Sequence, residues 1–325
     1  MKSRIFTILV LAAGLFASQA NSLDLNLQPY KVRENISGKL KSVGSDTMAH
    51  EMQLWVDGFK QYYPSVEIDI EARGSNTAPS ALLSGEAQLG PMSRQMTPDE
   101  MNSFVARYGY KPTGVLVAVD ALAIYVNKNN PINCLSMDQV ERIFSADPRS
   151  EGGVSARTWG DVGATGEWAS KPIALHSRNS LSGTYKFFRL NVLGGRDFKD
   201  NIKLNEGSEG VVSSVGIDPY AIGYSGIGYK TSEVKAISIR GGATSTCLEP
   251  SFENTYTHKY PLARGLYVYL LKNPKAPLDT LSGEFVKYIL SSDGQAQAKH
   301  GGYYPITRNI REHELTRLGL LASAE

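Results

Sequence analysis

The sequence is poor in the features that mark several large classes of protein. It has only two cysteines among 325 residues and a formal net charge of +2, and it shows no internal repeat, low-complexity tract or long run of one charge. So few cysteines exclude a disulfide-dense miniprotein, and the near-neutral charge removes the usual basis for binding nucleic acid or an acidic membrane surface. With 42% hydrophobic residues, 31 Gly and 15 Pro, the composition is that of a folded protein, and the length predicts about two domains.

Sequence motifs of hydrolytic and metal-dependent enzymes are missing as well. The chain contains no G-x-S-x-G, no G-x-x-x-x-G-K-[ST] and no H-E-x-x-H. Its five histidines are dispersed without the spacing of metal ligands: His50, His176, His258, His300 and His313. We therefore expect neither an enzyme nor a metal site, and no cofactor.

The longest apolar stretch lies at the N-terminus. Lys2 and Arg4 precede an apolar segment from Ile5 to Phe16, and Ser18-Gln19-Ala20 has the small residues of a cleavage site. Because such a segment is too short to span a bilayer comfortably, residues 1–20 are predicted to be a secretory signal peptide, with a buried or anchoring helix as the alternative. Cleavage after Ala20 would remove two basic residues from 34 Lys+Arg and leave 32 residues of each sign.

From about Lys39 onward, short β-rich runs alternate with helical patterns. This alternation is typical of an α/β fold around a mainly parallel sheet. Strands are predicted at 40–43, 66–70, 88–90 and 172–176, and helices at 47–63, 79–86 and 184–193. In the first helix the apolar residues recur at i, i+4, i+7, i+8 and i+11, as Met48, Met52, Trp55, Val56 and Phe59.

Two unusually long β-rich segments, 114–127 and 260–273, are interpreted as crossings between two lobes. Lobe 1 would then be built from both ends of the chain (25–117 and 265–325) and lobe 2 from its middle (118–264), with a hinge between them. Both cysteines, Cys134 and Cys247, fall in lobe 2. In an exported protein they could form a disulfide, which we expect; two separate buried thiols are the alternative.

Three predicted loops place hydroxyl groups at helix starts: Gly44–Thr47, Gly74–Thr77 and Arg178–Thr184. A helix N-terminus exposes backbone N–H groups and the positive end of the helix dipole, so it favours an anion. Plain capping by Ser, Asp or Thr is the alternative for any one loop. Arg178 adds the forked donors of a guanidinium, and Gly183 allows close approach of the backbone. Together the three loops predict an anion site.

These residues resemble those of the phosphate-binding proteins of high-affinity phosphate ABC transporters. The resemblance covers most of the chain through the segments GSDTM, RGSNTAPSAL, RNSLSGTYKFF, AIGYSGIGY and YPLARGLYVYL. Its most specific part is the spacing R-x-x-x-S-G-T from Arg178 to Thr184. The resemblance implies the type II periplasmic binding protein fold, with two α/β lobes, mixed sheets flanked by helices, and the ligand in the cleft between the lobes.

The resemblance also implies which residues bind phosphate. They are Ser45, Thr47, Ser75 and Ser93 in lobe 1 and Arg178, Ser182, Gly183 and Thr184 in lobe 2. Better-known members carry an aspartate in the loop after the third strand that accepts a hydrogen bond from protonated phosphate, whereas this chain has Met92-Ser93-Arg94. We therefore hypothesise that Asp46 is the acceptor and that Arg94 adds a second cation or fixes Asp46. The alternative is that Asp46 is an N-cap and Arg94 a surface residue.

The function implied by the resemblance is that of a periplasmic receptor. It would bind inorganic phosphate as a monomer and deliver it to the permease of an inner-membrane ABC transporter, without a cofactor and without a nucleic-acid partner. Two alternatives stay open. One is a weak phosphatase, because hydroxyl-rich loops also occur in phosphatases, and the other is a secreted or biofilm-associated protein of the same fold.

Overall fold

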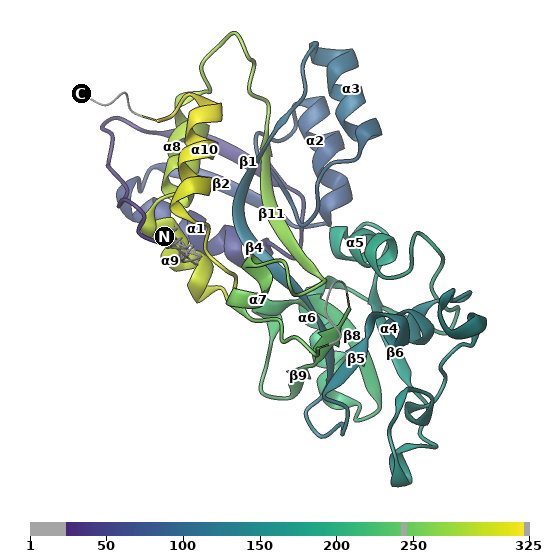
Figure 1. Cartoon of the computed structure of the whole chain (residues 1–325). Helices are drawn as coiled ribbons and strands as arrows, with labels where there is room; N and C mark the ends of the chain where they lie inside the picture. The colour runs from purple at the N-terminus through teal and green to yellow at the C-terminus, as the bar shows by residue number, and fades with distance from the viewer. Residues whose placement is uncertain (1–23, 242–245, 322–325) are drawn as a thin grey trace, which may run out of the picture.

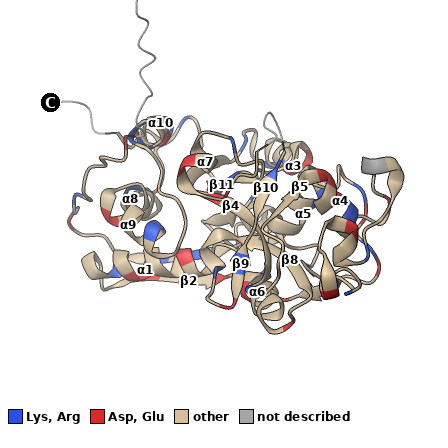
Figure 2. Cartoon of the chain, turned by 60° about the horizontal axis from the view of Figure 1, so that its bottom comes forward, with Lys and Arg blue, Asp and Glu red and all other residues tan. Residues whose placement is uncertain are grey.

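The computed structural model describes residues 24–241 and 246–321. The predicted signal peptide at residues 1–20 lies outside these ranges. Among the described helices, none combines the length and apolar character that a membrane span requires. Acidic and basic residues are interspersed over the helices and loops and do not gather on one side in the view of Figure 2.

The chain folds into two lobes that are joined by two long strands (Figure 1). These strands are β4 (Thr113–Asn127) and β11 (Ala263–Leu270). Lobe 1 contains β1 (Gly38–Val43), α1 (Ala49–Tyr62), β2 (Val66–Glu71), α2 (Ala78–Ser84), β3 (Gly90–Met92), α3 (Pro98–Tyr108), α8 (Thr280–Ile289), α9 (Ser292–His300) and α10 (Arg308–Leu318). Lobe 2 contains β5 (Cys134–Ser136), α4 (Met137–Phe144), β6 (Ala174–Arg178), α5 (Gly183–Asn191), β7 (Lys203–Asn205), α6 (Gly207–Ile217), β8 (Ala221–Gly226), β9 (Val234–Ala236), β10 (Ser238–Arg240) and α7 (Phe252–Tyr256).

The largest sheet passes through both lobes with the strand order β3-β11-β4-β8-β6-β7, and β9 also pairs with β4. Strand β4 pairs antiparallel with β11, β8 and β9, whereas β6 pairs parallel with β7 and β8. Strands β1 and β2 form a separate parallel pair. The sheets are therefore mixed, and the expectation of a mainly parallel sheet is wrong at its centre. There β11 carries the chain back along β4, and a strand that returns beside the one it left runs antiparallel to it.

Buried hydrophobic side chains form one large cluster in each lobe. The cluster of lobe 1 takes its residues from 27–118 and 266–318, and the cluster of lobe 2 from 121–262. The two clusters part along β4 between Ala118 and Ala121 and along β11 between Leu262 and Leu266. Each lobe thus has its own core. Within the described residues, β4 and β11 are the strands along which the backbone passes from one core to the other.

The cysteine pairing expected from the sequence is confirmed. Cys134 and Cys247 form a disulfide, with Cα atoms 6.0 Å apart and a sequence separation of 113. It ties the start of β5 to the segment after β10, beside the bridge between Ile239 and Leu248. In the chain-entropy account, a closed loop of this length contributes about 4–5 kcal/mol to stability.

Helix α1 confirms its predicted apolar face and departs from the prediction at one residue. Met48, Met52, Trp55, Val56 and Phe59 are all buried, as their spacing predicts. Glu51, which the same pattern assigns to the polar side, is also fully buried. Neither of its carboxylate oxygens has a hydrogen-bond partner among the described residues.

Glu51 gives a prediction about stability and pH. Burial raises the pKa of Glu51 to about 8, whereas the pKa of a glutamate in an unfolded chain is about 4.3. The folded protein therefore binds one more proton than the unfolded chain between these values, so the free energy of unfolding falls by up to about 1.4 kcal/mol per pH unit across that window. Replacing Glu51 by Gln removes this loss.

We expect the melting temperature of Glu51→Gln, relative to the wild type, to rise between about pH 5 and pH 8 and to level off above. Thermal unfolding followed by circular dichroism at each pH measures this difference. Asp57→Asn, at an exposed position of the same helix, is the control and should give a flat difference. A flat difference for Glu51→Gln as well would contradict the prediction.

Candidate functional site

The three loops predicted from the sequence meet where the two lobes face each other. The first lies between β1 and α1, the second between β2 and α2, and the third between β6 and α5. The second and third loops are in direct contact, because Asn76 N donates to Leu181 O at 3.1 Å and Asn76 Nδ2 donates to Ser180 O at 2.6 Å. Lobe 1 and lobe 2 are therefore closed upon each other at this point.

Buried hydroxyl groups from both lobes line this contact. Thr47 Oγ1 of lobe 1 lies 2.8 Å from Thr184 Oγ1 of lobe 2, and Ser75 Oγ lies 3.3 Å from Ser93 Oγ. All four residues are fully buried. Gly183 packs against the serines so closely that a Cβ atom at this position would lie 2.2 Å from Ser75 Oγ and 2.7 Å from Ser93 Oγ. The sequence-predicted ligands thus form one cluster.

Arg178 supplies the positive charge of the cluster. Its side chain is 2% exposed, and its Nη2 lies 2.5 Å from Asp46 Oδ2, in the other lobe. Its Nη1 donates to Ser208 Oγ at 2.9 Å. The guanidinium therefore joins the first and third loops through an ion pair that spans the cleft.

Several polar atoms of the site lack a partner within the described part of the chain. They are Ser45 Oγ, Asp46 Oδ1 and Arg178 Nε, all of them buried. Buried polar atoms in folded proteins are nearly always hydrogen-bonded, so these three atoms are available to bind water or a ligand. A carboxylate oxygen can only accept a hydrogen bond, whereas a guanidinium can only donate one. A ligand that paired with both would need an acceptor atom and at least one proton.

Helix capping explains one of the predicted site residues and not another. Ser182 is the N-cap of α5, where its hydroxyl accepts hydrogen bonds from the backbone N–H groups of Thr184 and Tyr185. Its own proton stays available to a ligand. Asp46 does not cap α1, because the N-cap there is Met48, without a side-chain cap bond.

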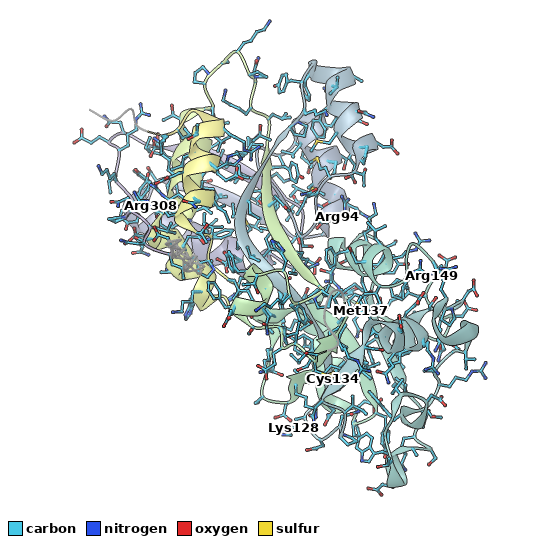
Figure 3. All side chains as sticks on the ribbon, viewed as in Figure 1. Arg94, Lys128, Cys134, Met137, Arg149 and Arg308 are labelled. Carbon is cyan, nitrogen blue, oxygen red and sulfur yellow. A yellow bond between two sulfur atoms is a disulfide. The ribbon has the colours of Figure 1, made fainter. Side chains whose placement is uncertain are left out.

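The structure corrects one role that we hypothesised for Arg94. Arg94 is 7% exposed, so it is not a surface residue, but it does not fix Asp46. Its guanidinium pairs with both oxygens of Glu100, at 2.8 and 2.6 Å, and donates to Asn76 Oδ1 at 2.6 Å. These bonds hold the second loop against the start of α3, and Asp46 pairs instead with Arg178. Figure 3 places Arg94 where the part of lobe 1 that carries α2 meets α5.

Three residues of the site were not predicted from the sequence. Besides its bond to Arg178, Ser208 Oγ lies 3.4 Å from Thr47 Oγ1. The hydroxyl of Tyr229 donates to Asp46 O at 3.0 Å, and that of Tyr303 donates to Thr47 O at 2.7 Å. Burial raises the pKa of both tyrosines well above the usual value, so both remain protonated donors. A signal for Ser208 was present, because Gly207-Ser208 at the start of α6 repeats the Gly-Ser pair of the first two loops.

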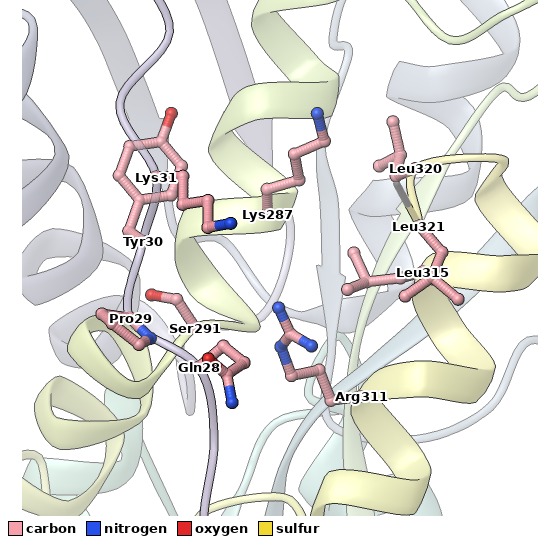
Figure 4. Close-up of a pocket in the computed structure, with 10 residues that line it drawn as sticks. All are labelled: Gln28, Pro29, Tyr30, Lys31, Lys287, Ser291, Arg311, Leu315, Leu320 and Leu321. Atoms are coloured by element: carbon pink, nitrogen blue, oxygen red, sulfur yellow. The ribbon is translucent and has the colours of Figure 1, made fainter. Parts of the chain in front are cut away.

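The site is distinct from the cavity shown in Figure 4. That cavity, of about 250 Å³, lies among residues 28–31, α8 and α10, and Lys31, Lys287 and Arg311 are among the residues that line it. None of its lining residues belongs to the three loops.

Within 24–241 and 246–321, no three His, Cys, Asp or Glu residues are grouped so that they could hold a metal ion.

Comparison with known proteins gives a family match and close relatives. Residues 32–293 match the PBP superfamily domain. The curated phosphate-binding protein PstS of Pseudomonas aeruginosa is 45% identical over 321 residues, which are 98% of this chain and 99% of that protein. A substrate-binding protein from Clostridium perfringens, solved with bound phosphate, aligns with a TM-score of 0.70 at 23% identity, over 83% of this chain and 100% of its own. An ABC-type phosphate transport receptor from Vibrio cholerae aligns with a TM-score of 0.64 at 22% identity, over 82% and 99%.

The packing of Gly183 generates a prediction about closure. In Gly183→Ala the new methyl group would overlap Ser75 and Ser93 of the other lobe, so the loops could not reach the contact seen here. We expect the lobes of Gly183→Ala to stay further apart, so that its radius of gyration, measured by small-angle scattering, exceeds that of the wild type. Its melting temperature should change little, because each lobe keeps its own core.

Gly210→Ala is the matched control, since a Cβ atom there meets only Asn205 Cβ, at 3.6 Å. This variant should have the radius of gyration of the wild type. A wild-type radius of gyration in Gly183→Ala would show that the lobes do not meet in the way described.

Proposed function

This chain belongs to the PBP superfamily and, within it, to the family of the phosphate-binding proteins PstS, and on that basis we propose that it captures inorganic phosphate between its lobes for import by an ABC transporter. One observation carries the proposal most. The R-x-x-x-S-G-T loop of lobe 2 lies against the hydroxyls of lobe 1. Ser45 Oγ, Asp46 Oδ1 and Arg178 Nε there are buried without a hydrogen-bond partner among the described residues.

The proposed phosphate ligands are the clustered residues together with Ser208. From lobe 1 they are Ser45, Asp46, Thr47, Ser75 and Ser93, and from lobe 2 Arg178, Ser182, Gly183, Thr184 and Ser208. Hydroxyls, backbone N–H groups and the guanidinium would donate to the phosphate oxygens and replace their hydration shell. Asp46 would accept the proton of the hydrogen phosphate ion. Arg94 would act from the edge of the site, where it holds Asn76.

Closure would follow from ligands that come from both lobes. An anion can drive closure only if it binds the closed form better than the open form, and a ligand set shared between lobes gives that difference. We place the lobe boundaries at 25–117 with 265–325 and at 118–264. The hinge would lie at the irregularity in β11 between Leu266 and Tyr267, because it falls beside the boundary between the two cores.

The proposal includes a location and a partner. The family's relatives are named as binding proteins, and the hydroxyls of this site have no histidine or lysine within hydrogen-bond distance in the described chain. We therefore favour a receptor over a phosphatase. It would act in the periplasm after export through the N-terminal signal and, as a monomer, would deliver phosphate to a membrane permease.

Arg178→Ala tests the site directly. The change would leave the anion without its main charged donor and Asp46 without its partner, so we expect the dissociation constant for phosphate to rise at least about a hundredfold. Isothermal titration calorimetry measures it. Arg73→Ala, which removes an exposed cation close to the second loop, should change affinity little. Wild-type affinity in Arg178→Ala would mean that phosphate binds elsewhere.

Asp46→Asn tests the acceptor. Hydrogen phosphate and hydrogen arsenate bring a proton to the carboxylate, whereas sulfate brings none and would place an oxyanion against it. We expect the wild type to prefer phosphate and arsenate over sulfate, and the variant to lose at least about tenfold of this preference. The informative quantity is the ratio of the affinities for phosphate and sulfate. Asp46→Asn also weakens the ion pair with Arg178, and any resulting change at Arg178 affects the binding of all three anions. An unchanged ratio would rule out Asp46 as the acceptor.

A further inference from the structure

A second buried arginine lies directly behind the site, on the strands that join the lobes. Arg264 of β11 and Asp120 of β4 are register partners in the antiparallel pair. Arg264 Nε lies 2.8 Å and Nη2 lies 2.7 Å from Asp120 Oδ2, and the two side chains are 2% and 0% exposed. The other carboxylate oxygen of Asp120 accepts a hydrogen bond from Ile227 N at 3.0 Å. The carboxylate thus fixes the guanidinium from one side.

The free arm of this guanidinium reaches the site. Arg264 Nη1 donates to Thr184 Oγ1 at 2.9 Å, and Thr184 Oγ1 lies 2.8 Å from Thr47 Oγ1. A guanidinium has donors only, so Thr184 must accept this bond. The single proton of the threonine hydroxyl then points away from Arg264, toward Thr47 and the space for the ligand.

We propose that Arg264 is a positioning residue that orients the Thr184 hydroxyl as a hydrogen-bond donor to phosphate, with Asp120 as its anchor. This inference rests on the proposed function. Without Arg264, the Thr184 hydroxyl could turn its proton away from the ligand and present lone pairs to a phosphate oxygen. With Arg264 in place, that orientation is excluded by a charged donor. The anion therefore meets a hydroxyl donor that is already aligned, and none of its binding free energy is needed to rotate the Thr184 hydroxyl.

Pairing of the strands does not require this ion pair. Strands β4 and β11 share a ladder from Ala263 to Leu270, and buried ion pairs can often be replaced by apolar residues without loss of stability. What the apolar residues could not supply is the bond to Thr184. A lysine could keep the charge beside Asp120, but it lacks the planar fork that reaches Asp120 and Thr184 together.

A double-mutant cycle with phosphate tests the proposal. We expect Arg264→Lys to raise the dissociation constant for phosphate by about tenfold or more, and Thr184→Val, which removes the hydroxyl, to do the same. If Arg264 acts through Thr184, Arg264→Lys should have little further effect in the Thr184→Val background. Equal effects of Arg264→Lys with and without the threonine hydroxyl would overturn the proposal, as would wild-type affinity in Arg264→Lys.

Two further variants separate positioning from folding. Asp120→Asn leaves the arginine in place but weakens its anchor, so it should lower phosphate affinity in the same direction, and this loss should also vanish in Thr184→Val. Arg189→Lys, at a partly exposed arginine of α5 that pairs with Asp197, is the control and should bind normally. Melting temperatures without phosphate are measured for all variants, and a loss of binding that follows melting temperature and not the Thr184 hydroxyl would contradict the proposal.

The same titrations distinguish a failure of this inference from a failure of the proposed function. If the wild-type protein does not bind phosphate, the proposed function is wrong and the inference falls with it. If the wild type binds and the cycle shows no coupling between Arg264 and Thr184, only the inference is wrong.

Discussion

The contact between Arg178 and Asp46 is the interaction on which the arrangement of the site depends. It joins a residue of each lobe at 2.5 Å in a largely buried position, and the Arg264–Asp120 pair lies close behind it. The charges within each pair cancel, so an anion that enters meets two arginines and two carboxylates whose formal charges sum to zero. Its charge must then be stabilised by oriented hydroxyls, backbone N–H groups and the N-terminus of α5, which act strongly where water is excluded. A chain with nearly balanced charge can therefore bind an anion.

Much of the fold was predictable from local patterns, and the failures have a common cause. The spacing of apolar residues in α1 and the lengths of the crossing strands reflect which face of an element is buried, and sequence periodicity reports that directly. Two features were not predictable in this way. The antiparallel direction of β11 beside β4 depends on where the chain travels between them, and the burial of Glu51 depends on α9 and Gly301, some 250 residues later in sequence.

The candidate site was predicted in part, because its residues are marked by local loop chemistry. Loops with a hydroxyl and a glycine at a helix start can be found in a sequence, and the structure brings these loops together. The partners of the charged residues could not be assigned in the same way, since Arg94 pairs with Glu100 and Asp46 with Arg178 through tertiary packing. A signal for the Arg264–Asp120 pair was nevertheless present. Asp120 is the one charged residue of 114–127, and Arg264 stands among the apolar residues of 260–273. A buried charge needs a partner of opposite sign, so these two residues could have been matched.

The two crossing strands explain how the lobes could close at little energetic cost and still bring the site residues to defined positions. Strand β4 has 15 residues, enough to extend about 50 Å, and it is hydrogen-bonded to β11 at the level where the cores separate. The irregularity between Leu266 and Tyr267 interrupts this ladder, and a bulge lets paired strands bend with little loss of hydrogen bonds. The Arg264–Asp120 pair lies a few residues away on the lobe 2 side, in regular register. Bending at the bulge would therefore carry Arg264 and Thr184 together as part of lobe 2, so the donor would arrive at the phosphate already oriented.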